Sequence, residues 1–498
     1  MPRPRLLCPP DLARVRRELD RIRHELGIPD AFDPAVLAAA DAAVAAGPTV
    51  PPGADPRRRD ATDLPLVTID PRGSTDLDQA FTAARRGAGH RVHYAIADVA
   101  AFVAPDDPVD REARRRGVTL YAPDRRTPLH PPVLGDGAAS LRASEVRPAL
   151  LWTIDLDDTG EIGDARLERA WVRNRAELSY ADAQERIDAM GADADDPLAV
   201  LREIGQRRLA LEERRDAVHL ALPDQEVVEG PDGRIELRYD VSRPVEDWNA
   251  QISLLTGIAA ARIMLDAGIG LLRTLPPPDH RTVAALRRSA RALGIEWPDT
   301  WSYARRIRTL RPDTPAAIAL LAQAARALRG AGYTVIDDGV PPERLVHSAI
   351  ASTYAHVTAP LRRLCDRYTN EVVLAVCAGR EAPTWATGML DELPRIMARA
   401  RHLDGQLDRA VVDLMEALLL EPHVGETFRA VVVDTEERRG HHRARIQLRD
   451  PAVIARMDDG RVRPGTEIGV ALVAVDVTAR SVTFRPDGSA GAGADVSG

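Results

Sequence analysis

The chain has 498 residues, of which 67 are basic and 75 acidic, so its formal net charge is −8. This balance excludes an attraction of the whole surface to nucleic acid, and any nucleic-acid site must be a local basic feature. Three cysteines exclude a disulfide scaffold and a four-cysteine zinc site, and no apolar run reaches the ~18 residues of a membrane span.

The N-terminal region predicts two helices followed by a linker. Asp11 is a suitable N-cap for a helix over 12–26, whose apolar residues fall on one face, and an alanine-rich helix follows over 34–46. Residues 47–63 are rich in proline, glycine and charge, which is typical of a linker. The first residues lack the long apolar core of a signal peptide, so we expect a soluble, cytoplasmic protein.

The middle of the chain predicts a mixed α/β domain of about 350 residues. Strand patterns occupy 64–70, 93–103 and 150–162, and the last of these enters an Asp-Gly turn. Between residues 180 and 420 most of the apolar periodicity is helical.

The C-terminal part returns to strand periodicity. Four short strand patterns at 426–437, 441–450, 466–476 and 480–486 favour a small barrel of the OB kind. We therefore expect an α+β protein that combines a mixed α/β domain with an OB-like β-barrel. The expected units are a helical N-terminal segment and linker (1–60), the mixed domain (61–422), the barrel (423–486) and a disordered tail (487–498).

The most informative segment is TIDPRGSTDLDQAF, residues 68–81. Asp70 closes a strand, and a turn can fold it back toward Asp76 and Asp78, beside Gln79. Carboxylates held this close repel one another unless a cation is present, and oxygen ligands favour Mg²⁺ or Mn²⁺ over zinc. The alternative is an acidic surface turn, because Asp and Gly are ordinary turn residues.

Five ordered blocks resemble the ribonuclease II (RNB) family. The segment above resembles its strand ending in T-I-D-P with a following D-x-D-D run. The other blocks are HYAIADVAAFV (93–103), DREARRRGVTLYAPDRRTPLHPPVL (110–134), PVEDWNAQISLLTGIAAA (244–261) and YAHVTAPLRRLCDR (354–367). The resemblance implies an RNB catalytic domain and a hydrolytic exoribonuclease that degrades single-stranded RNA from its 3′ end to nucleoside 5′-monophosphates. Because only about 60 residues precede it, we expect a compact member without N-terminal cold-shock domains.

The resemblance assigns the metal site to Asp70, Asp76 and Asp78, with Asp76 and Asp78 also catalytic and Mg²⁺ or Mn²⁺ as cofactor. Gln79 stands at the fourth acidic position and offers a neutral carbonyl oxygen instead of a charge. We expect a retained but altered metal site. Replacing Gln79 by Asp should raise metal affinity if position 79 lies in the site.

Arg362 matches the family's catalytic arginine, because a guanidinium fork suits the scissile phosphate and its developing charge. Arg363 is the alternative, and it also counts as a candidate RNA contact, as do His356 and Thr358 of the same block. An arginine pair at a helix start can also be a solvated face.

Four further residues are candidate RNA contacts. Tyr121 matches an aromatic that stacks on a base near the 3′ end, although Tyr in a strand is often core. Glu246 can accept from a ribose 2′-hydroxyl, or it can simply favour a helix start. Arg443 and Arg445 share one strand face and could meet phosphates, or belong to a solvated hairpin. Since the chain contains no lysine, arginine clusters alone do not mark a site.

The sequence thus predicts a metal-dependent 3′-to-5′ exoribonuclease that acts on single-stranded RNA as a monomer, with no membrane partner. The main rival is a catalytically weak or inactive RNA-binding protein on the RNB fold. A third reading, an unrelated metal-dependent phosphohydrolase of small molecules, requires the ordered blocks to be a coincidence.

Overall fold

The computed structural model describes residues 12–51, 53, 57–191, 194–218, 220, 225–229, 235–239, 243–337, 339–438, 441–448, 453–458 and 462–487. The expected tail lies outside these residues, apart from Asp487. Its α-helices are α1 (Leu12–Glu25), α2 (Pro34–Ala46), α3 (Pro108–Arg116), α4 (Tyr180–Ala189), α5 (Pro197–Arg214), α6 (Pro244–Asp266), α7 (His280–Ala292), α8 (Tyr303–Arg308), α9 (Pro315–Ala327), α10 (Leu364–Cys377), α11 (Thr384–Thr387) and α12 (Leu393–Leu420).

The strands alternate with these helices along the chain. They are β1 (Arg59–Asp70), β2 (Gln79–Arg86), β3 (Gly89–Ala97), β4 (Leu120–Tyr121), β5 (Arg126–Thr127), β6 (Val146–Leu156), β7 (Ile162–Ser179), β8 (Gln225–Glu229), β9 (Ile235–Tyr239), β10 (Leu271–Thr274), β11 (Gly332–Val335), β12 (Val346–His347), β13 (Ser352–Thr353), β14 (Thr427–Arg438), β15 (His441–Leu448), β16 (Ile454–Asp458), β17 (Glu467–Asp476) and β18 (Ser481–Pro486). Short helical turns occur at η1 (Val99–Ala101), η2 (Val133–Ala138), η3 (Pro342–Arg344) and η4 (Glu421–His423).

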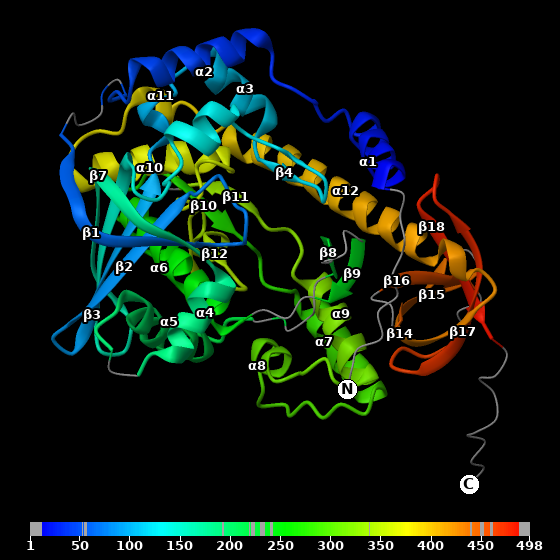
Figure 1. Ribbon diagram of the computed structural model, residues 1–498. Helices are drawn as coiled ribbons and strands as arrows, with labels where there is room; N and C mark the ends of the chain where they lie inside the picture. Colours follow the sequence, from blue (N-terminus) through cyan, green and yellow to red (C-terminus); the bar gives the residue numbers. More distant parts are fainter. Residues whose placement is uncertain are drawn as a thin grey trace.

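The first half of the chain is built on a closed barrel in the order β1-β2-β3-β6-β7. Neighbouring strands run antiparallel, except that β7 pairs in parallel with β1 and closes the barrel. The main core contains Tyr94 and Trp152 from the barrel and Ile252 and Leu255 from α6. Helices α4, α5, α6 and α10 lie against the barrel, on the left in Figure 1.

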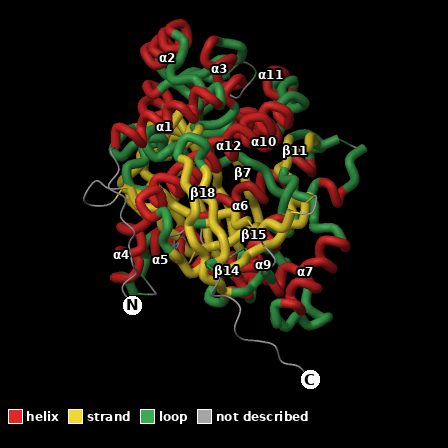
Figure 2. The backbone as a smooth tube through the Cα atoms, turned by 90° about the vertical axis from the view of Figure 1, so that its right-hand side faces the viewer, coloured by secondary structure: helices red, strands yellow, loops and turns green. Residues whose placement is uncertain are grey.

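The second barrel has the order β14-β15-β16-β18-β17 and lies at the far end of the long helix α12. Its core is apolar and includes Ile446, Val470 and Phe484, and Leu420 at the end of α12 packs into it. The view in Figure 2 looks along the molecule, with this barrel in front of the helices around the first barrel. The predicted mixed domain with an OB-like barrel is confirmed.

Helix α1 joins the two halves. Its Val15, Leu19 and Ile22 pack on α12 in a separate apolar cluster. At one point Arg23, only 2% exposed, donates to both carboxylate oxygens of Asp124, at 2.9 and 2.6 Å. This bidentate pair fixes the loop between β4 and β5, and so positions Tyr121 at the edge of that loop.

The predicted linker over 47–63 is too long. Strand β1 already begins at Arg59, and its first residues pair with Ala170 and Val172 of β7. The sequence does not reveal this start of the strand, because residues 59–63 are mostly charged and only Ala61 among them is fully buried. Among the described helices, none has the length and apolarity needed to cross a membrane.

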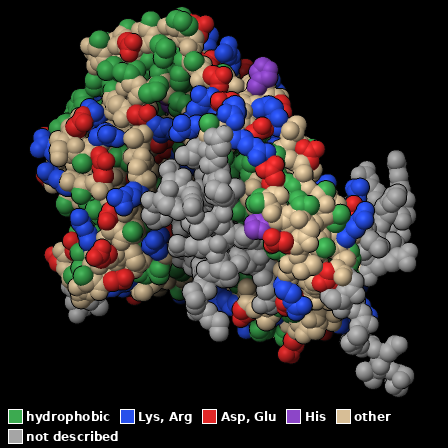
Figure 3. Space-filling view, turned by 45° about the vertical axis from the view of Figure 1, so that its right-hand side comes forward, with side chains coloured by type: hydrophobic (Ala, Val, Ile, Leu, Met, Phe, Trp, Pro, Cys, Tyr) green, Lys and Arg blue, Asp and Glu red, His purple; other side chains and the backbone are tan. Residues whose placement is uncertain are grey.

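Figure 3 shows acidic and basic side chains interspersed over the face that it draws. This agrees with a chain whose basic and acidic residues nearly balance in number.

Candidate active site

The three aspartates lie where β1 ends and β2 begins. The hydroxyl and amide of Ser74 donate to the Pro71 carbonyl at 2.8 and 3.1 Å, and Gly73 has a positive φ of 87°, which glycine adopts without strain. The Ser140 hydroxyl accepts from the Leu77 amide and donates to the Thr75 carbonyl. These bonds hold the loop on both sides of Asp76.

Asp78 is the most buried carboxylate of the loop, at 3% exposure. Its Oδ1 accepts from the Leu361 amide at 2.7 Å, whereas its buried Oδ2 has no hydrogen-bond partner. The Arg362 Nε lies 3.4 Å from that Oδ2. Burial raises the pKa of Asp78 to about 8, although the Arg362 charge opposes the shift.

Asp70 repeats this pattern at the end of β1. Its Oδ2 is also buried without a hydrogen-bond partner. Burial raises the pKa of Asp70 to about 6, with Arg362 lowering it and the Asp76 charge raising it. Asp70, Asp76, Asp78 and Arg362 therefore belong to one electrostatic neighbourhood.

Asp76 is held to one side of this neighbourhood. Arg126 places Nη1 2.5 Å from Asp76 Oδ1, and the Tyr121 hydroxyl donates to Oδ2 at 3.0 Å. Among the described His, Cys, Asp and Glu side chains, one group of three has its ligand atoms within 4.8 Å of one another, and it does not include these aspartates. The carboxylates of the three aspartates therefore do not converge on one point, and the Asp76 carboxylate forms an ion pair with Arg126 instead. The sequence did not single out Arg126, since arginine is abundant throughout the chain.

The residues present fit a divalent metal ion. Asp70 and Asp78 each keep one buried carboxylate oxygen without a hydrogen-bond partner, and an ionised carboxylate is costly to bury unless its charge is compensated. A hard cation bound by oxygen ligands removes this cost. Asp70 and Asp78 would hold such an ion, whereas the Asp76 carboxylate is engaged by Arg126 through Oδ1 and by Tyr121 through Oδ2.

The other trio does not fit a metal. His356, Cys365 and Asp366 lie together, but Asp366 accepts from Arg363 and from the Ala359 amide. Burial raises the pKa of the Cys365 thiol, which keeps it protonated. This cluster therefore stabilises the loop that carries Arg362.

Gln79 has little capacity left to bind a metal. Its amide nitrogen donates to the Thr358 carbonyl at 2.6 Å, and its Oε1 accepts from the Tyr94 hydroxyl at 2.9 Å. The side chain thus ties β2 to the loop before α10. Only the second lone pair of Oε1 remains for a metal.

Replacing Gln79 by Asp should therefore have two opposite effects. The unfolding free energy in EDTA should fall by ~1–3 kcal/mol, because the Thr358 carbonyl loses its donor. Metal affinity should rise, because a charge is added beside Asp78. Thermal unfolding with increasing Mg²⁺ measures both effects. The Gln79→Asn variant has the same length without the charge, and equal Mg²⁺ responses of the two variants would contradict this account.

Arg362 and Arg363 differ sharply in their surroundings. The Arg362 side chain is 44% exposed and faces Asp78. Arg363 is mostly buried, and its Nε and Nη2 donate to the two oxygens of Asp366 at 3.0 and 2.7 Å. The structure therefore leaves Arg362 available to a substrate and gives Arg363 a supporting position.

His356 and Thr358 also lie inside the supporting loop. His356 Nδ1 is 2.8 Å from the Tyr333 hydroxyl, and desolvation lowers the pKa of His356 well below its ordinary value. Thr358 is buried, and its hydroxyl lies 3.4 Å from Arg363. Thr358 is thus shielded from an RNA in this arrangement, whereas His356 is half-buried.

Tyr121 is 50% exposed, which disfavours the reading that it is a core residue. It ends β4, pairs with Arg126 on β5, and its hydroxyl reaches Asp76. Its ring is thus anchored at one end and open to a base at the side of the carboxylates.

A change of Tyr121 to Ala should weaken binding of a short single-stranded RNA about tenfold, because a stacked base contributes ~1–3 kcal/mol. Tyr121→Phe keeps the ring, loses only the bond to Asp76, and should bind nearly as well as the parent. Fluorescence anisotropy in EDTA measures both variants. An equal loss in the two would show that the hydroxyl, not the ring, matters.

Helix α6 contributes the remaining side of the site. Glu246 accepts from the Arg243 amide at 3.1 Å in a capping box, which favours the helix-start interpretation. One turn further, Asn249 donates to the Ile69 carbonyl at 3.3 Å, and Ser253 lies 2.9 Å from the Tyr94 hydroxyl. The sequence did not single out Asn249 or Ser253, since polar residues at helical spacing are common.

Arg443 and Arg445 are exposed on β15 of the second barrel. They pair across the sheet with Asp458 and Arg456 of β16, and Arg443 lies 3.7 Å from Asp458. Arg445 and Arg456 place two like charges directly opposite each other, and the carboxylates of Glu416 and Asp434 near Arg445 and of Asp413 near both arginines offset this repulsion.

Comparisons with known proteins match both parts of the chain. Residues 58–379 match the RNB domain, and residues 426–487 match the RNase II-type exonuclease C-terminal S1 domain. Ribonuclease R of Escherichia coli is 27% identical over 416 residues, which cover 77% of this chain and 49% of that protein. The chain thus spans about half the length of the curated relatives that it matches most fully.

Solved structures share the fold. One is RNase R of Mycoplasma genitalium, solved in complex with ribose methylated single-stranded RNA, with a TM-score of 0.82 at 19% identity. The superposed region covers 95% of this chain and 78% of the Mycoplasma genitalium chain. Yeast Ssd1, described as a pseudonuclease, has a TM-score of 0.67 at 16% identity, covering 92% of this chain and 58% of its own. The fold alone therefore does not decide whether a member is active.

Proposed function

Since this chain belongs to the RNB family, with the RNB domain matched over residues 58–379, we propose that it is a metal-dependent 3′-to-5′ exoribonuclease. Its substrate is single-stranded RNA and its products are nucleoside 5′-monophosphates. The resemblance found in the sequence blocks is confirmed at the level of the family.

One observation carries the proposal. Two buried carboxylate oxygens that lack a hydrogen-bond partner, on Asp70 and Asp78, lie beside Arg362 at the end of β1. A pseudonuclease has no need to keep this costly arrangement, whereas a metal-dependent hydrolase uses it. This observation favours an active enzyme over the inactive RNA-binding rival.

Different residues of the chain have different roles in this reaction. Asp70 and Asp78 would hold Mg²⁺ or Mn²⁺, which would supply an activated water and neutralise charge on the phosphate. The Leu361 amide orients Asp78 through its Oδ1. Arg362 approaches the scissile phosphate and stabilises the charge that develops on it. Tyr121 stacks on a base near the 3′ end, and the second barrel binds the RNA further along.

The direction and the product are tested with a single-stranded RNA labelled in its last nucleotide. The proposal expects the labelled nucleoside 5′-monophosphate as the first product with Mg²⁺ or Mn²⁺, and none with EDTA. A circular RNA of the same sequence should stay intact. Cleavage of the circle, or release of a longer labelled fragment first, would overturn the exonuclease assignment.

A further inference from the structure

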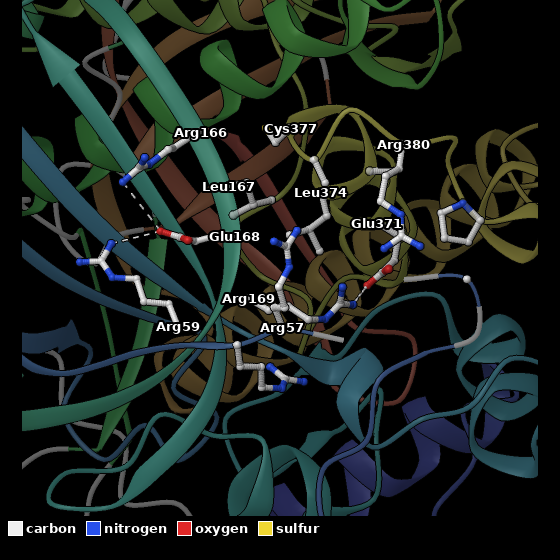
Figure 4. Close-up of a pocket in the computed structure, with 15 residues that line it drawn as sticks. Arg57, Arg59, Arg166, Leu167, Glu168, Arg169, Glu371, Leu374, Cys377 and Arg380 are labelled. Atoms are coloured by element: carbon white, nitrogen blue, oxygen red, sulfur yellow. Dashed lines mark hydrogen bonds and ion pairs between the residues drawn. The ribbon is translucent and has the colours of Figure 1, made fainter. Parts of the chain in front are cut away.

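A pocket of about 400 Å³, shown in Figure 4, is lined by residues of β1, β7 and α10. Strand β1 begins at Arg59 in this pocket and ends at Asp70 in the candidate active site. Helix α10 likewise starts beside Arg362 and lines the pocket with Glu371 and later residues. The pocket is therefore separate from the site described above.

Arginine dominates its lining. Six of the fifteen lining residues are arginines and two are acidic. One of the arginines, Arg169, is neutralised in a buried network, in which it pairs with Glu371 and with Asp98. Arg59 and Arg166 share the single carboxylate of Glu168, at 3.1 and 4.0 Å.

The remaining charge is in excess. Arg58 also pairs with Asp98, at 2.9 Å, so that carboxylate is shared between two guanidinium groups. Arg380 is exposed, and none of the described residues forms an ion pair with it. Without counting Arg57, the pocket region has five arginines and three carboxylates: Arg58, Arg59, Arg166, Arg169 and Arg380 against Asp98, Glu168 and Glu371. Such a surplus in a concave surface attracts anions.

One buried donor lacks an acceptor. The Arg58 side chain is 7% exposed, and its guanidinium lies 5.5 Å from the centre of the Trp171 ring. Its Nη1 is buried and has no hydrogen-bond partner. A buried guanidinium nitrogen without an acceptor is costly, and an anion in the pocket would satisfy it.

The rest of the lining is apolar, and Leu167, Leu374 and Pro383 contribute to it. An inorganic anion would leave this part unused, whereas a phosphorylated organic molecule would bury its carbon skeleton there. The pocket is too small for a folded segment or a long stretch of RNA.

We propose that this pocket binds a phosphorylated small molecule of about mononucleotide size. The phosphate lies at Arg58 and Arg380, because guanidinium groups bind phosphate oxygens through paired N–H donors. Arg166, which Figure 4 shows turned toward Glu168, adds to the positive charge of the lining. The organic part lies against Leu374 and Pro383. The assignment does not depend on the nuclease proposal, since no residue of the pocket takes part in that site.

The test uses calorimetric titration of AMP into the full chain carrying Asp78→Asn, in EDTA, so that neither metal nor hydrolysis intervenes. AMP should bind at one site, and adenosine should not bind measurably. In this background, Arg166→Gln combined with Arg380→Gln should weaken AMP binding at least about tenfold, because charge-assisted hydrogen bonds are lost. Both side chains are exposed, so the fold should be kept. Arg288→Gln, an exposed arginine on α7, is the matched control and should bind AMP normally.

Three results would overturn the proposal. An unchanged AMP affinity in the double variant would show that AMP does not bind in this pocket. Inorganic phosphate that binds as tightly as AMP would remove the organic ligand. A ten-nucleotide RNA without terminal phosphates that displaces AMP through Arg166 and Arg380 would assign the pocket to RNA instead. Arg58→Gln provides a second, independent loss of binding, with thermal unfolding as its folding control.

Discussion

The Asp78→Asn variant should lose RNA hydrolysis by at least about a thousandfold while keeping its affinity for RNA. Asp78 supplies one of the two buried oxygens that lack a hydrogen-bond partner and faces Arg362 at 3.4 Å, so it is central to both metal binding and charge stabilisation. Single-turnover rates with Mg²⁺ measure the loss, and anisotropy in EDTA measures the binding. A variant that retains a tenth of the parent rate would contradict the assigned role.

The same variant should be more stable than the parent when no metal is present. The folded pKa of Asp78, about 8, lies above its unfolded value near 3.8, so ionisation opposes folding. Parent stability should therefore fall as the pH rises from about 4 toward 8, and the advantage of Asn should be largest at pH 8 and small at pH 4. Asp70, with a pKa raised to about 6, adds a smaller loss of the same sign.

Thermal unfolding in EDTA at several pH values measures this difference. Asp76→Asn is the matched control, because it removes one of the two carboxylates that pair with Arg126, the other being Asp136, and should lower stability. Saturating Mg²⁺ should stabilise the parent and leave Asp78→Asn nearly unchanged. An Asn variant that is less stable than the parent at pH 8 would contradict the idea that this carboxylate is poised for a cation.

The Arg362→Gln variant should lower kcat about a hundredfold or more while folding normally. Its side chain is 44% exposed and makes only a 3.4 Å ion pair, so little stability depends on it. A preorganised donor that meets developing charge typically contributes this much to the rate. Because the contact strengthens in the transition state, KM should change much less than kcat.

Arg363→Gln is the informative comparison. Arg363 is mostly buried and bidentate with Asp366, which also accepts from the Ala359 amide. Its loss leaves a buried carboxylate unpaired and should lower the unfolding free energy by ~3–5 kcal/mol. If the stable variant were Arg363→Gln and the unstable one Arg362→Gln, the two roles would have to be exchanged.

The sequence predicts the local elements of this protein well. The helix expected over 34–46 is α2, and the strand expected over 64–70 lies within β1, because these segments carry clear apolar periodicity. The sequence did not predict the closure of the first barrel. Closure depends on parallel pairing between β1 and β7, about a hundred residues apart, with two shifts in register. No local pattern encodes such a contact.

The same distinction holds for the site. Asp70, Asp76 and Asp78 lie near one another as their spacing suggests, since one turn connects them. What the sequence could not supply is which carboxylates remain free. Arg126 reaches Asp76 from another hairpin, and Thr358 and Tyr94 occupy the amide of Gln79. These partners come from distant segments and are set only by the folded structure.

The most direct measurement of the central claim is a time course on a 5′-labelled single-stranded RNA with Mg²⁺ or Mn²⁺, comparing the parent with Asp78→Asn. We expect a ladder of products that shortens from the 3′ end with the parent and is absent from the variant and from the EDTA samples. RNA that is bound but stays intact with either metal would contradict it. The chain would then be a non-catalytic RNA-binding member of its family.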